Sequence, residues 1–244
     1  MSSFNVYDDA VRAASYSKLD FPGTYYLAFR DLPEILSPNV VGRRALDFGC
    51  GAGRSTRFLK NLGYHVIGLD ISASMIELAR VADPEGEYVQ TESDDFTILG
   101  RKPFDLILSA FTFDNIPNEG RRIALMCGLR ERLSSTGRLV ILGSTPEIYT
   151  HEWTSFTTAA FPENKRARSG QTVRIVMKDV SDTRPVIDWI WFRADYERLF
   201  ANSGFELIEE HRPLGRSNEP FAWILETTVA PWVIYVVRPK RPRV

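Results

Sequence analysis

The chain contains few cysteines: Cys50 and Cys127 are the only two among 244 residues. Two thiols do not make the disulfide framework of a small secreted protein. Cys50 also lies inside a glycine-rich stretch, where a disulfide would obstruct a ligand. We therefore expect reduced thiols in a cytoplasmic protein. The cysteines and the three histidines lack metal-ligand spacings, so no metal is expected.

Long apolar runs and an excess of one charge are also missing. No run approaches the roughly 20 residues that a membrane-spanning helix needs. The segment Met1 to Asp9 has neither the basic region nor the apolar core of a signal peptide. Thirty basic residues face 31 acidic ones, for a net charge of −1. This balance provides no general attraction for nucleic acid or an anionic membrane, and we expect neither as a partner.

The most informative feature present is a glycine-rich turn between two apolar runs. Gly49, Gly51 and Gly53 stand at alternate positions after an apolar run that contains Asp47, and the next apolar run ends in Asp70. Glycine lets the backbone pass close to a ligand. An acid at the end of the following strand is placed to bind a pair of ribose hydroxyls. The pattern predicts a pocket for an adenosine-containing cofactor at the carboxyl ends of parallel strands.

The spacing of the turn separates the cofactor classes. A dinucleotide fingerprint is G-x-G-x-x-G and a P-loop ends in Gly-Lys-Ser/Thr, whereas Arg54 stands here where the third glycine should be, and no P-loop occurs. The turn resembles the first motif of class I S-adenosylmethionine-dependent methyltransferases, in which an acid precedes G-x-G-x-G. Residues 70–80, 104–111 and 133–143 resemble later motifs of the family, in order. The resemblance implies S-adenosyl-L-methionine as cofactor and S-adenosyl-L-homocysteine as product.

The alternation of strand and helix patterns predicts an α/β fold. We expect a doubly wound, mostly parallel seven-stranded sheet of the Rossmann-like methyltransferase type, with an antiparallel last strand. The predicted strands are 44–48, 66–69, 88–90, 105–109, 138–142, 205–209 and 232–237. Predicted helices cover 7–17, 25–36 (ending before Pro38), from Ser72 or Ser74 to 81, and 55–62, 119–133 and 194–201.

Four segments are expected in this order: an N-terminal helical cap (1–38), the cofactor-binding core (39–143), an inserted lid that covers the substrate (144–192), and the C-terminal part of the same core sheet (193–244). Within the lid, residues 172–180 and 186–192 predict an antiparallel hairpin.

The resemblance assigns cofactor contacts to the strand ends and turns. The glycine backbone would pass under the methionine moiety, with Asp47 orienting the loop or binding the ammonium through water, and Asp70 would accept both ribose hydroxyls. Met75 either covers the adenine or fills the core. Ser93 and Asp94 either meet the adenine edge or form an exposed acidic turn. The remaining candidates for cofactor contact are Cys50, Ile71 and Ser109.

The sequence motifs for binding the methyl acceptor are less specific than those for the cofactor. Residues 109–115 depart from the Asn/Asp-Pro-Pro-Tyr/Phe signature of enzymes that methylate base amines or glutamine amides. His151, at the start of the lid, is the candidate general base, or else a structural or surface histidine. Aromatic and basic residues of the cap and lid either enclose an organic acid or form a small core with a solvated face. The candidates for substrate binding are Tyr25, Phe111, Trp153, Arg168 and Arg174.

We therefore expect methyl transfer to a small organic acceptor, with O-methylation ahead of N- or C-methylation. Three alternatives stay open: methylation of RNA or a peptide, a cofactor-binding module without turnover, and a dehydrogenase. The acceptor, the methylated atom and the oligomeric state are not decided by the sequence.

Overall fold

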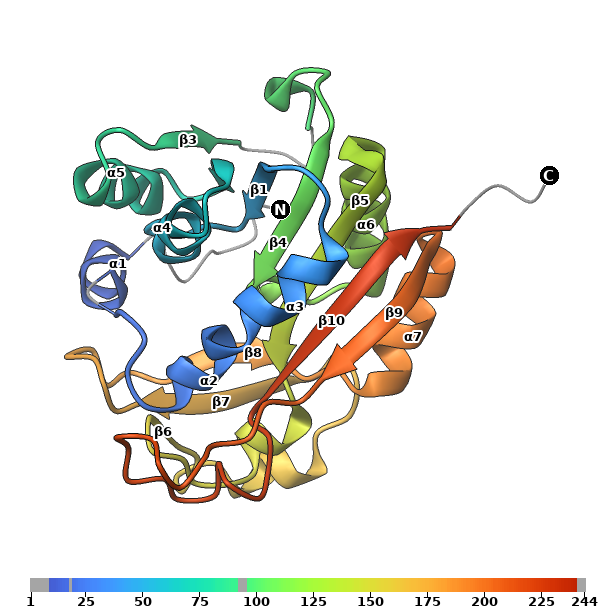
Figure 1. Cartoon of the computed structure of the whole chain (residues 1–244). Coiled ribbons are helices and arrows are strands. Elements are labelled where there is room, and N and C mark those ends of the chain that lie inside the picture. Colours follow the sequence, from blue (N-terminus) through green and yellow to red (C-terminus); the bar gives the residue numbers. More distant parts are fainter. Residues whose placement is uncertain (1–8, 18, 92–95, 241–244) are drawn as a thin grey trace.

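The computed structural model describes residues 9–17, 19–91 and 96–240, and its centre is a seven-stranded sheet of order β3-β2-β1-β4-β5-β10-β9 (Figure 1). The strands are β1 (Arg44–Phe48), β2 (His65–Asp70), β3 (Glu87–Gln90), β4 (Phe104–Ala110), β5 (Leu133–Ser144), β9 (Phe205–His211) and β10 (Trp232–Pro239). Strand β10 pairs antiparallel with β5 and β9, and the pairs among β1 to β5 are parallel. The predicted mostly parallel sheet with an antiparallel last strand is confirmed.

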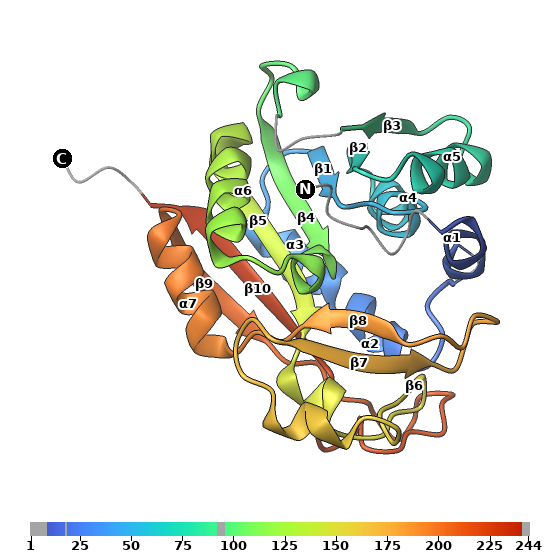
Figure 2. The ribbon, with the colours of Figure 1, turned by 180° about the vertical axis from the view of Figure 1, so that it is seen from behind.

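Helices cover both faces of this sheet (Figures 1 and 2). They are α1 (Ala10–Tyr16), α2 (Thr24–Arg30), α3 (Leu32–Asn39), α4 (Arg54–Asn61), α5 (Ala73–Ala82), α6 (Glu119–Arg132) and α7 (Arg193–Asn202). On β4, Leu106 and Leu108 join the buried cluster of α2 and α3, whereas Ile107 joins the cluster of α6 and α7. This alternation is the two-residue period of a strand that is buried on both faces.

A second, three-stranded antiparallel sheet runs across the carboxyl ends of β4 and β5 (Figure 1). Its strands are β6 (Phe156–Thr157), β7 (Thr172–Met177) and β8 (Val186–Trp189). The predicted hairpin is confirmed as the β7–β8 pair. Strand β6 has only two residues, too few to leave an alternating pattern in the sequence. The chain also has short 3₁₀ helices. Of these, η2 (Thr97–Leu99) precedes β4, η3 (Thr112–Asn115) follows β4, η4 (Pro146–Tyr149) connects β5 to β6, and η5 (Pro162–Arg166) connects β6 to β7.

The prediction of one helix over residues 25–36 is wrong, because the chain breaks at Asp31 into α2 and α3. Pro33 has no N–H to continue the hydrogen bonding of α2, but it fits the first turn of a new helix. The expected end before Pro38 is also wrong, since α3 contains this proline in its last turn and continues to Asn39. A proline here removes one hydrogen bond from a turn that is already near the end of its ladder.

Helix α1 links the two sheets. Arg12 forms an ion pair with Asp182 at the tip of the β7–β8 hairpin (3.3 Å), and the hydroxyls of Ser15 and Ser181 are 3.0 Å apart. On the other side, Ala13 packs in a small buried cluster with Met75 of α5. The helix therefore lies between the end of β2 and the second sheet, over the carboxyl ends of the parallel strands.

Candidate active site

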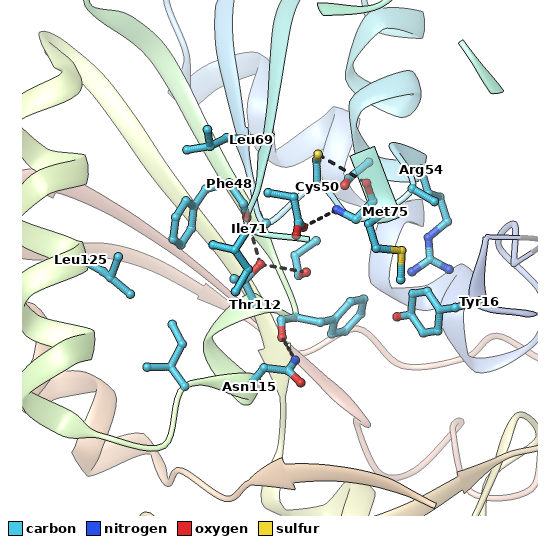
Figure 3. A pocket seen from close by; sticks show the side chains of 18 of the residues that line it. Tyr16, Phe48, Cys50, Arg54, Leu69, Ile71, Met75, Thr112, Asn115 and Leu125 are labelled. Atoms are coloured by element: carbon cyan, nitrogen blue, oxygen red, sulfur yellow. Dashed lines mark hydrogen bonds between the residues drawn. The ribbon is translucent and has the colours of Figure 1, made fainter. Parts of the chain in front are cut away.

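A cleft of about 240 Å³ opens at the carboxyl ends of β1, β2 and β4 (Figure 3). Its lining comes from the turn after β1, the end of β2, the start of α5, the end of β4 and helix α1. The sequence-predicted residues that line it are Gly49, Cys50, Gly51, Asp70, Ile71, Met75 and Phe111. This is the edge at which α/β sheets bind ligands, since the strand ends and following turns leave a crevice there.

The turn after β1 uses its three glycines for different contacts. All three have positive φ angles: 74° at Gly49, 53° at Gly51 and 78° at Gly53. A Cβ at Gly49 would collide with Thr112, and one at Gly53 would collide with the ring of Tyr88. A Cβ at Gly51 would meet no heavy atom within 4 Å and would project into open space. Gly51 is therefore where backbone faces the cleft directly, while Gly53 packs the turn and does not line the cleft.

Asp70 ties the ends of β1 and β2 together. One carboxylate oxygen accepts the backbone N–H of Gly51 (2.8 Å) and the other accepts the N–H of Ser72 (2.9 Å). A carboxylate oxygen has more than one acceptor site, so it can accept more than one donor at a time. The cleft-lining position suits a pair of vicinal hydroxyls on a ribose, because a carboxylate can accept two donors at once.

Asp47 is fully buried and does not line the cleft. One of its oxygens accepts the hydroxyls of Ser55 (2.7 Å) and Thr56 (2.6 Å), both on the first turn of α4. Burial raises the pKa of Asp47 to about 6, against the lowering effect of these two hydrogen bonds. Of its two expected roles, the geometry favours orientation of the loop. Ser109 is likewise fully buried and outside the lining, and Ser93 and Asp94 lie outside the described residues.

Arg54 brings a positive charge to the cleft, a contact that the sequence analysis did not assign. Its guanidinium lies 4.8 Å from the ring centroid of Tyr25 and 5.9 Å from that of Tyr16, and it donates to the carbonyl of Asp20 (2.8 Å). Figure 3 shows Arg54 and Tyr16 on the same side of the cleft. A guanidinium beside the glycine turn has several N–H donors and suits a carboxylate such as that of a methionine moiety.

A smaller inner pocket adjoins the cleft, and Tyr16, Phe111 and Asn115 line both. Phe111, which directly follows β4, is the one non-glycine residue with a positive φ (63°) in the part of the chain that the structure describes. The amide nitrogen of Asn115 donates to the carbonyl of Phe111 (3.0 Å; Figure 3). Strained backbone of this kind persists where surrounding contacts hold it, often at functional sites.

The inner pocket has aromatic walls and two carboxylates. Tyr25 and Trp232 pack against Phe111, with Tyr25 and Phe111 at a centroid distance of 5.9 Å, and Phe156 packs against Tyr25 and Trp232. Asp114 of η3 accepts the backbone N–H of Ser144 (2.9 Å).

Asp188 of β8 accepts the hydroxyl of Tyr149 (3.0 Å). Burial raises the pKa of Asp114 to about 6, and burial together with the charge of Asp114 raises that of Asp188 to about 7. Asp188 reaches this pocket only because the second sheet folds over the strand ends, so no local signal in the sequence marks it.

The structure does not bring the other acceptor-side candidates into the pocket. His151 lies outside both linings, and its Nδ1 lies near the carbonyl of Glu147 (3.1 Å) and the hydroxyl of Thr150 (3.0 Å). Trp153 is fully buried in the core, where its indole N–H donates to the carbonyl of Ile148. Arg174 pairs with Glu163. Arg168, in the loop between η5 and β7, and Arg174, on β7, are both exposed and are absent from both linings.

The described residues contain no group of three or more His, Cys, Asp or Glu side chains that could hold a metal ion. None of the helices in the described ranges has both the length and the apolar character that crossing a membrane demands.

Comparison with known proteins agrees with the geometry. The family model of a methyltransferase domain matches residues 45–137. N-demethylindolmycin N-methyltransferase of Streptomyces griseus is 26% identical over 85% of this chain and 86% of its own length. Demethylmenaquinone methyltransferase of Thermotoga maritima is 35% identical, but the match covers only 44% of this chain and 46% of that enzyme.

Among solved structures, the glycopeptide N-methyltransferase MtfA in complex with S-adenosylmethionine superposes with a TM-score of 0.60 at 17% identity, covering 90% of this chain and 96% of that one. The fold is thus that of a Rossmann-like methyltransferase. Residues 45–137 of the chain are a methyltransferase domain of the S-adenosylmethionine-dependent type.

Proposed function

We propose that this methyltransferase acts on a small organic molecule whose reactive end enters the inner pocket. The observation that carries the proposal is the shared wall of Tyr16, Phe111 and Asn115 between the cofactor cleft and the inner pocket. When bound, S-adenosylmethionine supplies a methyl group made reactive by its sulfonium. A group that reaches the shared wall from the inner pocket would approach the cleft without passing through solvent, and such positioning accounts for much of the rate enhancement in displacement reactions.

The residues of this site would have separate roles in binding and in excluding water. Asp70 and the turn around Gly51 would hold the ribose and the methionine moiety, and Arg54 would pair with the carboxylate. The rings of Tyr25 and Phe111 would exclude water from the reacting end of the acceptor. The small volume of the inner pocket, about 40 Å³, argues against RNA or a folded protein as the acceptor.

The acceptor atom depends on the lining of the pocket. O-methylation was favoured in the sequence analysis together with His151 as a base, but His151 does not line the pocket. A hydroxyl would therefore need another base, and an acceptor that is already anionic would face Asp114 and Asp188. The matched relatives do not decide the atom, since their names describe different acceptors: one is an N-methyltransferase of N-demethylindolmycin and the other methylates demethylmenaquinone.

The proposal is tested by closing the inner pocket. Val186 lines it, whereas its neighbour Ile187 on β8 points the other way and is 39% exposed. The full chain is incubated with S-adenosylmethionine and a panel of small amines, alcohols, phenols and carboxylic acids, and S-adenosylhomocysteine is quantified by mass spectrometry. We expect Val186→Phe to abolish acceptor-dependent turnover while it still binds S-adenosylhomocysteine, and Ile187→Phe to retain turnover. Undiminished turnover in Val186→Phe would place the acceptor elsewhere.

A further inference from the structure

The inner pocket has an excess of negative charge that its own lining does not neutralise. Asp114 and Asp188 both line it, and among the described residues of the lining there is no lysine, arginine or histidine. Arg122 acts on Asp114 electrostatically, but it is stacked on Trp191 (4.1 Å to the ring centroid) and does not line the pocket. Because buried carboxylates are costly without a partner, the pocket favours a ligand that brings a positive charge.

Besides the hydroxyls of its tyrosine and serine residues, the pocket is lined by carboxylate and amide oxygens, which are acceptors. One oxygen of Asp188 accepts the hydroxyl of Tyr149, and no donor among the described residues reaches its other oxygen. The amide of Asn115 gives its nitrogen to the carbonyl of Phe111, so its oxygen is buried without a partner in the described part of the chain. With Asp114, three side chains of the lining carry carboxylate or amide oxygens, and an ammonium group offers up to three N–H donors.

The rest of the lining also suits a cation. Phe111 and Trp232 lie edge to face with ring centroids 4.8 Å apart, and Tyr25 and Phe156 complete the aromatic wall. The faces of such rings attract positive charge. The volume of the inner pocket is about 40 Å³, room for only a few heavy atoms. It therefore fits the charged end of a molecule whose remainder extends toward the larger cleft.

We infer that the acceptor is a small primary or secondary amine that enters the inner pocket as its ammonium ion, and that Asp188 is the base that takes its proton. The inference rests on the proposed function. The groups that face Asp188 are Tyr149 of η4 and Asp114 of η3. Asp114 is faced in turn by Tyr196 of α7 and Arg122 of α6.

The proposed methyl transfer requires only the amine, Asp188 and S-adenosylmethionine. An ammonium nitrogen has no lone pair, so one N–H proton first passes to the carboxylate of Asp188, which becomes a carboxylic acid. The lone pair released on nitrogen forms a bond to the methyl carbon as the carbon–sulfur bond breaks, and the electron pair of that bond stays on sulfur. The positive charge thus moves from sulfur to nitrogen. A carboxyl group whose pKa is raised to about 7 is a suitable proton acceptor near neutral pH.

A binding experiment tests the ammonium pocket without turnover. The complex of the full chain with S-adenosylhomocysteine is titrated calorimetrically at pH 7.5 with benzylamine, 2-phenylethylamine and cyclohexylamine, each paired with the alcohol of the same skeleton. We expect at least one amine to bind tenfold or more tightly than its alcohol. Asp188→Asn should remove this preference. The matched control is Asp179→Asn, which removes the same charge from an exposed position between β7 and β8.

A pH profile tests the base. For an amine that is methylated, kcat/KM is expected to fall as the pH drops through about 7, since Asp188 then becomes protonated. The Tyr149 hydroxyl lowers the pKa of Asp188, so Tyr149→Phe should move this limb to higher pH while the preference for ammonium persists. If Asp188→Asn does not fold, Tyr149→Phe still tests the role of Asp188.

The outcomes separate the two proposals. Preferential amine binding without methylation of any acceptor would leave the ammonium pocket in place and overturn the proposed function. Methylation of alcohols or carboxylates in preference to amines would support the proposed function and overturn the amine inference. Equal binding of every amine and its alcohol, or an unshifted pH limb in Tyr149→Phe, would also overturn it.

Discussion

Substituting Gly51 by alanine isolates the effect of a side chain at the point where the turn faces the cofactor cleft. Gly51 (φ 53°) and Gly63 (φ 84°) both adopt left-handed torsions, and a Cβ at either position would meet no heavy atom within 4 Å. Left-handed torsions cost a residue with a Cβ roughly 1–2 kcal/mol. Gly51→Ala and Gly63→Ala should therefore lower the free energy of unfolding by similar amounts, which makes Gly63→Ala the matched control.

The two variants should differ in cofactor binding, because only Gly51 lines the cleft. Its new methyl group would occupy space that the methionine moiety needs. Inserting a methyl into a packed contact costs about 1–3 kcal/mol, which corresponds to a roughly 5- to 150-fold higher Kd. Isothermal titration of each variant with S-adenosylhomocysteine measures this change, and thermal melts of the unliganded proteins measure the strain.

The reasoning fails if Gly51→Ala and Gly63→Ala bind S-adenosylhomocysteine with the same Kd at comparable stability. The bound molecule would then lie away from the turn, and the assignment of Gly51 to its contact would be wrong. A large loss of affinity in both variants would also refute it, because the strain alone would then explain the loss.

Three further predictions follow from the site. Asp70→Asn should weaken the free energy of S-adenosylhomocysteine binding by about 1.5–3 kcal/mol, the contribution of a hydrogen bond to a charged group. Glu77→Gln, on the exposed side of α5, should bind S-adenosylhomocysteine as the wild type does in calorimetry. Equal affinities of the two variants would refute the ribose role of Asp70. Burial raises the folded pKa of Asp188 above its unfolded value, so its contribution favours folding at low pH and is lost as pH rises through about 7. Asp188→Asn should therefore gain stability over wild type in urea melts between pH 5 and 8, by at most a few kcal/mol, and a gain independent of pH would contradict this. His151→Ala should keep turnover within about twofold of wild type, an effect below roughly 0.5 kcal/mol, and a tenfold loss would restore His151 as a base.

Short-range spacing accounts for what the sequence predicted well. The turn at residues 49–53 and the acid at position 70 belong to one strand–turn–helix–strand unit, and parallel pairing of β1 with β2 brings them to the same edge. The glycine pattern and the cofactor class were therefore readable from a short stretch. The same local signal named Asp47 correctly as part of the unit, but only the structure shows that it is buried against Ser55 and Thr56.

The direction of the side chains explains why several residues expected to bind the substrate do not line the pocket. Trp153, Arg168 and Arg174 lie in the segment expected to cover the substrate, but composition does not show which face of a strand or turn a residue occupies. Trp153 points into the core and Arg174 pairs with Glu163 on the outer side. A one-residue change in strand register reverses the face of every side chain, so such assignments need the observed pairing.

The sequence by itself determined the α/β fold and the cofactor, because these depend on alternating apolar patterns and on turn residues close together in the chain. The tertiary structure alone decided the acceptor side. Asp188 on the second sheet comes to the same pocket as Asp114 of η3 only after the β7–β8 hairpin crosses the strand ends. Two carboxyl groups in a lining without a basic side chain are the basis of the proposed preference for a cation.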